Sequence, residues 1–266
     1  IEWFPKNGQQ TVDYVKQIIE YLDVDILALQ EIDDTNAFKQ MVTELEGFEY
    51  FIKSGWYAGL AYIYKTDLFE INEMYEIYTT EPYWSPFPRS PVVMEMACWG
   101  QDYVIINNHL KCCGDGILDY DDNGDEETRR YIAMNLLKEY IDEYFSDKKV
   151  ILVGDLNDEI TDDMDNNVFQ QVLNDPNNYL FADMPIAEGP SIDWSYPTYP
   201  SHLDHILVTN EVFDTDEFSD YSIQTVRVDD YMGGGWDTYE EYVSDHRPVA
   251  IVLSPDSVVG IQNQLD

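Results

Sequence analysis

The chain has 266 residues, and its 44% hydrophobic content is typical of a folded globule rather than a disordered chain. Its 53 acidic residues outweigh 14 lysines and arginines, leaving a formal charge of −39, which argues against a basic nucleic-acid clamp and against docking on anionic membranes. No apolar run reaches the ~18–20 residues of a membrane span. We expect a monomer without a stable protein partner, in a setting rich in salt or bound divalent cations.

Helical and strand patterns alternate along the chain. In chain order they predict a helix at 8–23, a strand at 25–31, a helix at 35–45, strands at 49–53, 57–65, 69–78, 91–99 and 102–110, a helix at 126–145, a strand at 149–153, a helix near 165–174, and strands at 203–209 and 248–253. The longest helix is expected to pack through one stripe, formed by Ile132, Leu136, Tyr140 and Tyr144.

The interleaving of many strands with helices predicts an α/β (α+β) sandwich, in which two β-sheets pack face to face with helices outside. No repeat, low-complexity stretch or Gly/Ser/Pro-rich linker divides the chain. We therefore expect one domain over residues 1–254, followed by a polar tail or linker over 255–266.

Polar residues recur where the predicted strands end. These strand-end residues are Glu31, Asn107, Asn108, His109, Asp155, Asn157, Asp204, His205, Asp245 and His246. A single acid after a strand is usually a turn residue or a helix cap, but five such ends are hard to explain as turns. Carboxylates, amides and imidazoles are the groups that Mg²⁺- or Mn²⁺-dependent phosphoryl chemistry uses.

The order of the segments LQE, NNHLK, GDLND, LDHILV and SDHRPV resembles the endonuclease/exonuclease/phosphatase superfamily over about residues 1 to 253. The resemblance implies a four-layer sandwich of two packed mixed β-sheets flanked by helices. It implies a divalent-metal-dependent phosphoesterase. It also implies that the first strand of the fold, which carries an asparagine ligand, would precede Ile1.

The same resemblance implies a role for each matching residue. Glu31 corresponds to the metal-binding glutamate, and His109 to the first catalytic histidine, with Asp204 as the carboxylate that orients it. Asp155 corresponds to the residue that positions the attacking water, and Asn157 to the amide that holds the phosphate.

Three further positions complete the implied site. Asp245 corresponds to a second metal or water contact, and His246 to the histidine that faces the scissile phosphate. Arg89 resembles a substrate-phosphate arginine of the deoxyribonuclease branch. Ala58 stands where deoxyribonucleases carry a glutamate that orients the second histidine, which weakens the assignment to that branch.

The segment DYDDNGDEE is a second candidate metal site. A calcium loop would use Asp119, Asp121, Asn123, Asp125 and Glu127. Its twelfth position, however, is Arg130 rather than a bidentate glutamate. The alternative is an acidic loop that caps the following helix, where negative charge at the N-terminus is favourable. Calcium is therefore a second candidate cofactor beside Mg²⁺ or Mn²⁺.

The remaining cysteines, histidines and aromatics allow more than one interpretation. Cys112 and Cys113 could join to each other, or one of them could reach Cys98. His202 is expected to be a loop residue, and His205 to point away from Asp204 because neighbours on a strand alternate. The aromatic residues near 83–87 and 193–199 could stack on a base or sugar of a substrate, or they could fill loops that pack against the sandwich. We favour loop packing.

The predicted function is hydrolysis of phosphodiester bonds, most simply by a secreted endonuclease or exonuclease that tolerates high salt. The alternative is a phosphodiesterase or phosphatase that acts on a lipid headgroup or a small phosphorylated molecule. A third hypothesis, of another class, is a non-catalytic calcium-dependent binding module. The acidity and few cysteines favour export.

Overall fold

The computed structural model describes residues 1–55, 57–215, 218 and 221–253, so the expected tail lies outside the described residues. The helices are α1 (Gln9–Leu22), α2 (Thr35–Thr43), α3 (Glu126–Tyr144), α4 (Gln170–Leu173), α5 (Met184–Ala187), α6 (Asn210–Phe213) and α8 (Gly235–Tyr242), with 3₁₀ turns η1 (Ser191–Asp193) and η2 (Val228–Tyr231). The strands are β1 (Ile26–Ile32), β2 (Phe48–Lys53), β3 (Gly59–Lys65), β4 (Glu70–Glu76), β5 (Val92–Cys98), β6 (Gln101–His109), β7 (Lys149–Asp155), β8 (Tyr179–Phe181), β9 (Asp204–Thr209), β10 (Ser222–Thr225) and β11 (Val249–Val252).

Acidic caps fix where two of the helices begin. The Asp34 carboxylate accepts hydrogen bonds from the backbone N–H groups of Asn36 and Ala37, and α2 follows. The Asp125 carboxylate accepts from the Thr128 N–H at 2.7 Å, and α3 follows. Each carboxylate satisfies N–H groups that have no partner within the helix and complements its dipole.

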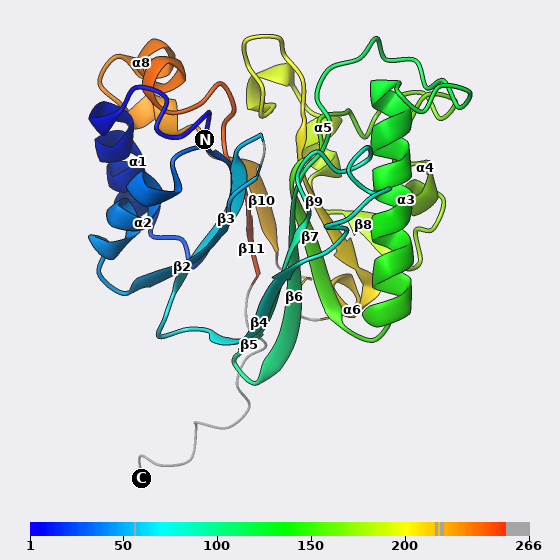
Figure 1. Cartoon of the computed structure of the whole chain (residues 1–266), viewed down its shortest axis with the longest axis horizontal. Coiled ribbons are helices and arrows are strands. Elements are labelled where there is room, and N and C mark those ends of the chain that lie inside the picture. Colours follow the sequence, from blue (N-terminus) through cyan, green and yellow to red (C-terminus); the bar gives the residue numbers. More distant parts are fainter. Residues whose placement is uncertain (56, 216–217, 219–220, 254–266) are drawn as a thin grey trace.

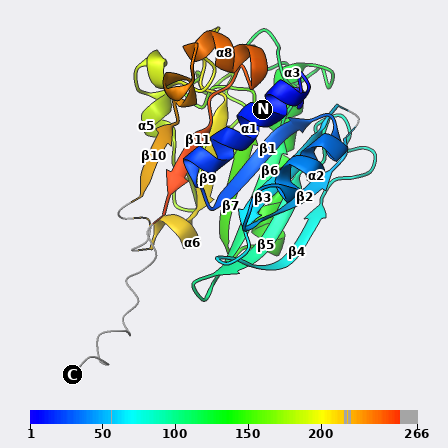
Figure 2. The same ribbon diagram turned by 90° about the vertical axis from the view of Figure 1, so that its left-hand side faces the viewer.

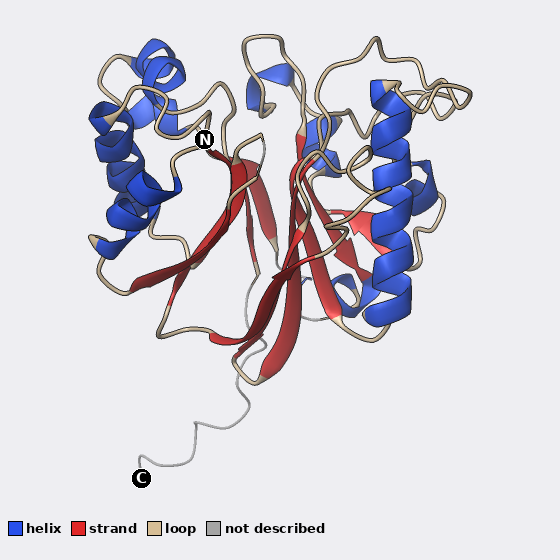
Figure 3. Ribbon diagram, viewed as in Figure 1, coloured by secondary structure: helices blue, strands red, loops and turns tan. Residues whose placement is uncertain are grey.

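The strands form two facing layers of β-sheet, and helices cover the outer side of each layer (Figures 1 and 3). The larger sheet has the order β4-β5-β6-β7-β9-β8, and β6 and β7 pair in parallel. The smaller layer contains the sheet β1-β3-β2 and the pair β10-β11. Figure 2 shows α1 and α2 lying across the outer face of β1, β2 and β3.

Three separate apolar clusters confirm the four layers. One packs the larger sheet against α3 and α4, with Leu137 and Leu152 among its buried members. A second packs α1 and α2 against the smaller sheet. The third lies between the sheets, around Tyr62 and Met94. Each layer is therefore buried on both faces, which explains why the middle of a strand such as β7, residues 150–153, is continuously apolar.

Two polar side chains bridge the sheets within the central cluster. The Asn107 Nδ2 group on β6 donates to the carbonyls of Leu29 and Ala61, at 3.1 Å each, and its Oδ1 accepts from Gln30 Nε2. The Tyr62 hydroxyl contacts two carbonyls of the larger sheet. Because these groups are buried, the bonds fix one alignment of the sheets, and with it the position of β1 relative to β6.

The fold differs from the prediction in two details. The described strands of the smaller layer pair only in antiparallel fashion, apart from a single parallel bridge between Phe4 and Ile32, so only the larger sheet is mixed. The predicted helix near 165–174 is limited to α4, because Asn167 instead uses its side chain to bond the preceding loop and the Phe169 N–H.

The predicted stripe of α3 is only partly correct, since Leu136 and Tyr140 pack against the core but are not fully buried. The residues that face the core are Ala133, Met134, Leu137 and Ile141, and Tyr144 is 58% exposed. Both stripes have helical spacing, and α3 is apolar on more than one side. In the observed orientation of the helix, Ala133 and Met134 pack close to the sheet, and Tyr140 and Tyr144 lie at the boundary between the core and the solvent.

Candidate active site

Strand register brings three of the predicted residues into one row. His109 is paired with Asp155 across the parallel ladder of β6 and β7, and Asp155 is paired with Asp204 across β7 and β9. The side chains at the ends of these three neighbouring strands therefore share one edge of the larger sheet.

Gly154 permits the close approach of β7 to β6 at this edge. Its φ is +136°, and a Cβ there would lie 2.0 Å from the Asn108 carbonyl oxygen. Only glycine adopts this conformation beside that backbone without strain. The residue that breaks the apolar run of β7 thus sets the spacing of the row.

Glu31 reaches the row from the smaller sheet. It lies at a register shift between β1 and β3 and has a φ of +62°, a conformation that is costly for a residue with a side chain and is concentrated at functional sites. Its Oε1 lies 3.9 Å from His109 Nε2, and its Oε2 accepts from the Trp3 N–H. The site is thus assembled from both sheets.

Asp204 pairs with His246, not with His109. The Asp204 Oδ2 and His246 Nδ1 atoms are 2.7 Å apart. This corrects the prediction that Asp204 orients His109. Ser195 Oγ accepts the backbone N–H groups of Leu203 and Asp204, so the start of β9 is held in place behind the pair.

A second frame holds the segment that carries His246. The Arg247 guanidinium donates two hydrogen bonds to the buried Asp229 carboxylate, and its backbone N–H donates to the Ser195 carbonyl. Bidentate pairs of this kind are geometrically specific. They place the loop between α8 and β11 over the start of β9, at Asp204. The sequence alone could not predict this position.

The Asp204–His246 pair polarises both residues. Burial lowers the pKa of His246, but the charges of Asp204 and Asp155 outweigh it and raise that pKa to about 10. Burial also raises the pKa of Asp204, but the charge and hydrogen bond of His246 lower it to about 2. At neutral pH the centre therefore contains an imidazolium held by a carboxylate.

Substitution of Asp204 by Asn should return the pKa of His246 from about 10 toward the ordinary value of ~6.5, because the largest opposing charge is lost. We expect the His246 ring proton signals to titrate near neutrality in NMR spectra of the variant and not below pH ~9 in the wild type. The signals of His205, which is bonded to Asp183, serve as the internal control. A His246 titration unchanged by the substitution would contradict the pairing.

Asp155 and His109 have the opposite tendency, toward the uncharged form. Burial raises the pKa of Asp155 to about 7, although the charge of His246 lowers it. Burial and the nearby Arg89 hold the pKa of His109 well below its usual value. His109 Nε2 lies 3.3 Å from Asp155 Oδ2. A neutral imidazole thus faces a carboxyl group whose ionisation falls near physiological pH, as suits a general base.

Arg89 and Asn157 also lie at the centre. The Arg89 Nη2 atom is 3.9 Å from Glu31 Oε1, and its Nε donates to the Tyr57 carbonyl. Asn157, with a φ of +57°, donates from its backbone N–H to Asp155 Oδ1 and from Nδ2 to the Leu110 carbonyl at 3.3 Å. Both occupy the places expected of phosphate-binding groups, and these roles remain predictions.

Asp245 adjoins the centre without joining its closest group. Its charge contributes to the raised pKa of His246, but the three residues whose ligand atoms lie within 4.8 Å of one another are Asp155, Asp204 and His246. Its predicted contact with a second metal or water therefore stays a prediction.

The centre has the chemistry of a divalent-cation site. Hard cations such as Mg²⁺ prefer carboxylate oxygens, and Glu31 and Asp155 each present one near the same atom, His109 Nε2, at 3.9 and 3.3 Å. Burial is the main cause of the raised pKa of Asp155, and the charges of Asp204 and Glu31 raise that pKa further; a cation beside these carboxylates would offset their repulsion. The residues present thus fit such an ion, with Glu31 and Asp155 to hold it.

The acidic segment before α3 is a helix cap in this structure. Asp125 is the N-cap of α3, as the alternative interpretation predicted. Glu127 is buried and pairs with Arg130, and its Oε1 accepts from the Gly116 N–H. The acids Asp115, Asp125 and Glu127 form a close group, which does not include Asp119 or Asp121. Binding of calcium by the loop stays a prediction.

One buried network was missed at the sequence level. Asp183 Oδ2 lies 2.6 Å from His205 Nδ1 and 3.0 Å from His202 Nε2, while its Oδ1 accepts from the Ile206 N–H. His205 points away from Asp204, as expected, and His202 lies in a loop, as expected, but it is buried. Acids and histidines are rarely buried without pairing, so burial of these residues would have indicated the network. The sequence did not reveal it because Asp183 lies far along the chain from the two histidines.

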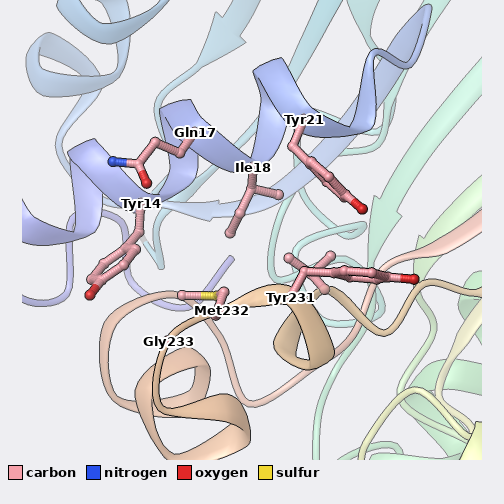
Figure 4. Close-up of a pocket in the computed structure, with 8 residues that line it drawn as sticks. Tyr14, Gln17, Ile18, Tyr21, Tyr231, Met232 and Gly233 are labelled. Carbon is pink, nitrogen blue, oxygen red and sulfur yellow. The ribbon is translucent and has the colours of Figure 1, made fainter.

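A groove of about 310 Å³ lies elsewhere, between α1 and η2 (Figure 4). It is lined by Tyr14, Gln17, Ile18, Tyr21, Val228, Tyr231, Met232 and Gly233. The exposed rings of Tyr21 and Tyr231 lie 5.4 Å apart at its edge. None of the strand-end residues lines it, so we assign the chemistry to the sheet edge and not to this groove.

The fold and this centre together define a metal-dependent phosphoesterase. Residues 4–246 match the model of the Endonuclease/Exonuclease/phosphatase family, and the chain belongs to that family. It is accordingly a hydrolase that acts on phosphoester bonds, and the hypothesis of a non-catalytic binding module is wrong.

Solved structures of the same fold share little sequence with the chain. TDP2 from D. rerio, complexed with single strand DNA product, is 15% identical with a TM-score of 0.67, over 93% of this chain and 92% of that one. The catalytic domain of human nocturnin is 15% identical, with a TM-score of 0.62 over 93% and 88%. The mannosyl-6-phosphatase of Bacteroides thetaiotaomicron is 19% identical, with a TM-score of 0.59 over 93% and 91%.

A sequence comparison with curated proteins found no match. No described helix is long and apolar enough to cross a membrane.

Proposed function

We propose that the protein hydrolyses phosphodiester bonds of nucleic acid with the help of a divalent metal ion. The observation that carries this proposal is the convergence of the strand-end residues on one sheet edge, with the carboxylates of Glu31 and Asp155 both near His109 Nε2. Such a centre can hold a phosphate, activate a water molecule and stabilise the charge that develops on phosphorus.

The residues divide this work between them. Asp155, ionised near neutral pH, accepts the proton of the attacking water. The His246 imidazolium, held by Asp204, donates to a phosphate oxygen as negative charge develops there. The neutral His109 ring and the Arg89 guanidinium, 11% exposed, provide further donors. A divalent cation on Glu31 and Asp155 would neutralise part of the phosphate charge.

Aromatic rings at the rim favour a nucleic acid as substrate. The Tyr196 ring lies 4.8 Å from the His246 ring, and Tyr199, 72% exposed, lies 6.3 Å from Tyr196. The exposed Tyr199 ring, which neighbours the ring beside the catalytic histidine, can stack on a base, and stacking of this kind does not require a basic groove.

The second candidate substrate is a small phosphorylated molecule or a lipid headgroup, and the charge of −39 favours the small molecule. Like charges repel a long polyanion more strongly than a small phosphoester, and salt reduces that repulsion. The acidic composition predicts secretion into a salt-rich medium. This prediction is compatible with either substrate.

Substitution of Tyr199 by Ala should distinguish the candidates. We expect the wild type, with Mg²⁺, to cleave single-stranded oligonucleotides, and the variant to show a KM raised about tenfold, since one lost base–ring contact costs ~1–3 kcal/mol. Hydrolysis of a chromogenic phosphodiester without a base should not change. Tyr144→Ala, at an exposed position on α3, is the matched control.

Steady-state rates on oligonucleotide, duplex DNA, a sugar phosphate monoester and the chromogenic diester provide the measurement. Preference for the monoester, or an oligonucleotide KM that Tyr199→Ala leaves unchanged, would overturn the nucleic-acid assignment and leave the phosphoesterase in place.

A further inference from the structure

Two adjacent cysteines lie on the loop that leaves the active site. Cys112 and Cys113 follow the last residue of β6, His109, by three and four positions, and both are exposed. Their Sγ atoms are 2.9 Å apart, with the Cys113 thiol donating to Cys112 Sγ. The two sulfurs therefore already face each other, although neighbouring side chains in an extended segment point to opposite sides.

A buried arginine holds the backbone on both sides of the pair. Arg130 is buried, and its Nη1 donates to the carbonyls of Lys111 and Cys113, at 2.7 Å each. Its Nε donates to Asp158 Oδ2 at 2.8 Å, and Asp158 follows β7 at the active-site edge. Because the loop is fixed to α3 and to this segment, little conformational entropy remains to be lost when the sulfurs approach.

The third cysteine cannot take part. Cys98 is buried and is paired with Gln101 at the start of β6, whereas Cys112 lies beyond its other end at His109. Eight residue steps along that strand span about 27 Å, and a disulfide requires Cα atoms within ~7 Å. The geometry thus decides between the two pairings that the sequence allowed.

We propose that Cys112 and Cys113 form a redox modification site beside the active centre, where a low-molecular-weight disulfide oxidises them to a vicinal disulfide. Cys112 Sγ, with Lys111 Nζ at 3.7 Å, attacks one sulfur of the external disulfide. This step forms a mixed disulfide and releases one small thiolate. Cys113 Sγ then attacks Cys112 Sγ, closes the protein disulfide and releases the second thiolate. The two thiol protons pass to the released thiolates, so two protein thiols are oxidised and one external disulfide is reduced.

The site is close enough to the centre for its state to matter there. The Leu110 carbonyl, between His109 and Lys111, accepts from Asn157 Nδ2, and Arg130 joins the Cys113 carbonyl to Asp158. Oxidation replaces two thiols of this loop with one disulfide-containing ring.

Mass spectrometry of the full chain tests the proposal. The reduced protein is incubated with oxidised glutathione, denatured under acid and digested with trypsin. Cleavage after Lys111 and Arg129 places both adjacent cysteines in peptide 112–129 and leaves Cys98 in peptide 90–111. We expect peptide 112–129 to lose about 2 Da, the mass of two hydrogen atoms, and dithiothreitol to restore it.

Matched variants make the result specific. Cys112→Ser should leave Cys113 carrying a stable glutathione adduct without the 2 Da loss, and Cys98→Ser should behave as the wild type. Glutathione adducts on both cysteines of the wild type would overturn the proposal. So would unreacted thiols, or a peptide cross-linked to Cys98 or to a second chain.

Discussion

Replacement of Asp155 by Asn is expected to lower kcat by about 10²–10⁴-fold, the usual contribution of a general base, and at the same time to stabilise the fold. The amide is nearly isosteric and still accepts the Asn157 N–H bond to Oδ1. It cannot, however, take a proton from water. The measurements are single-turnover hydrolysis of a phosphodiester and urea unfolding, each made on the wild type and on Asp155→Asn.

The stability gain has a defined pH dependence. Because burial raises the pKa of Asp155 to about 7, the carboxylate is less stable in the folded than in the unfolded protein. This penalty is absent below pH ~4 and complete above ~7, where it reaches up to about 4 kcal/mol without metal. The gain of Asp155→Asn should grow over that range and shrink when Mg²⁺ is added.

The control for this prediction is Asp165→Asn, at an exposed position of the loop after β7. It should change neither kcat nor the unfolding midpoint. An Asp155→Asn protein that keeps wild-type activity would refute the catalytic role. One that is less stable than the wild type at pH 8 without metal would refute the unfavourable burial of this charge.

Replacement of Asp183 by Asn should cost about 3–5 kcal/mol of unfolding free energy, because it removes one partner of a fully buried charge pair. Asp183 bonds two histidines and one backbone N–H behind β9. An amide keeps the shape but puts an N–H donor or a neutral oxygen where ring nitrogens need a charged acceptor. Asp214→Asn, at an exposed position, is the matched control.

The loss should be largest in mildly acidic solution. Burial opposes ionisation of Asp183, but the two histidines hold its pKa below the usual range, so its contribution is present above pH ~4. Burial also lowers the pKa of His205, but Asp183 outweighs it and raises that pKa, so this contribution is complete below ~6.5 and declines as pH rises. The difference between wild type and variant, from urea unfolding at pH 5.5 and 9, should therefore narrow at pH 9. Equal stability of the two proteins at pH 5.5 would contradict the account.

The chemistry of the site could be predicted from the sequence because each catalytic side chain lies beside a strong local signal. Asp155 and Asn157 follow an unbroken apolar strand, and His109 ends another. Parallel and antiparallel pairing then requires such strand ends to meet at one edge. The layers could be predicted for the same reason, since strands buried on both faces need cover on both.

The errors concern relations that depend on tertiary positions. Asp204 faces His246 because the Arg247–Asp229 pair holds a loop over β9, and no local pattern encodes that placement. The stripe of α3 was only partly correct because two faces have helical spacing and only packing against the sheet selects between them. Asp183 stood in a short segment without periodicity, so its two histidine partners could not be assigned to it.

The Mg²⁺ dependence of phosphodiester hydrolysis in wild type and Glu31→Gln tests most directly whether the strand-end residues act around one cation. Loss of a carboxylate ligand should raise the Mg²⁺ concentration for half-maximal activity by at least about tenfold. Asp121→Asn, in the acidic loop before α3, should leave it unchanged. Equal Mg²⁺ dependence in Glu31→Gln and wild type would contradict a metal centre at this edge of the sheet.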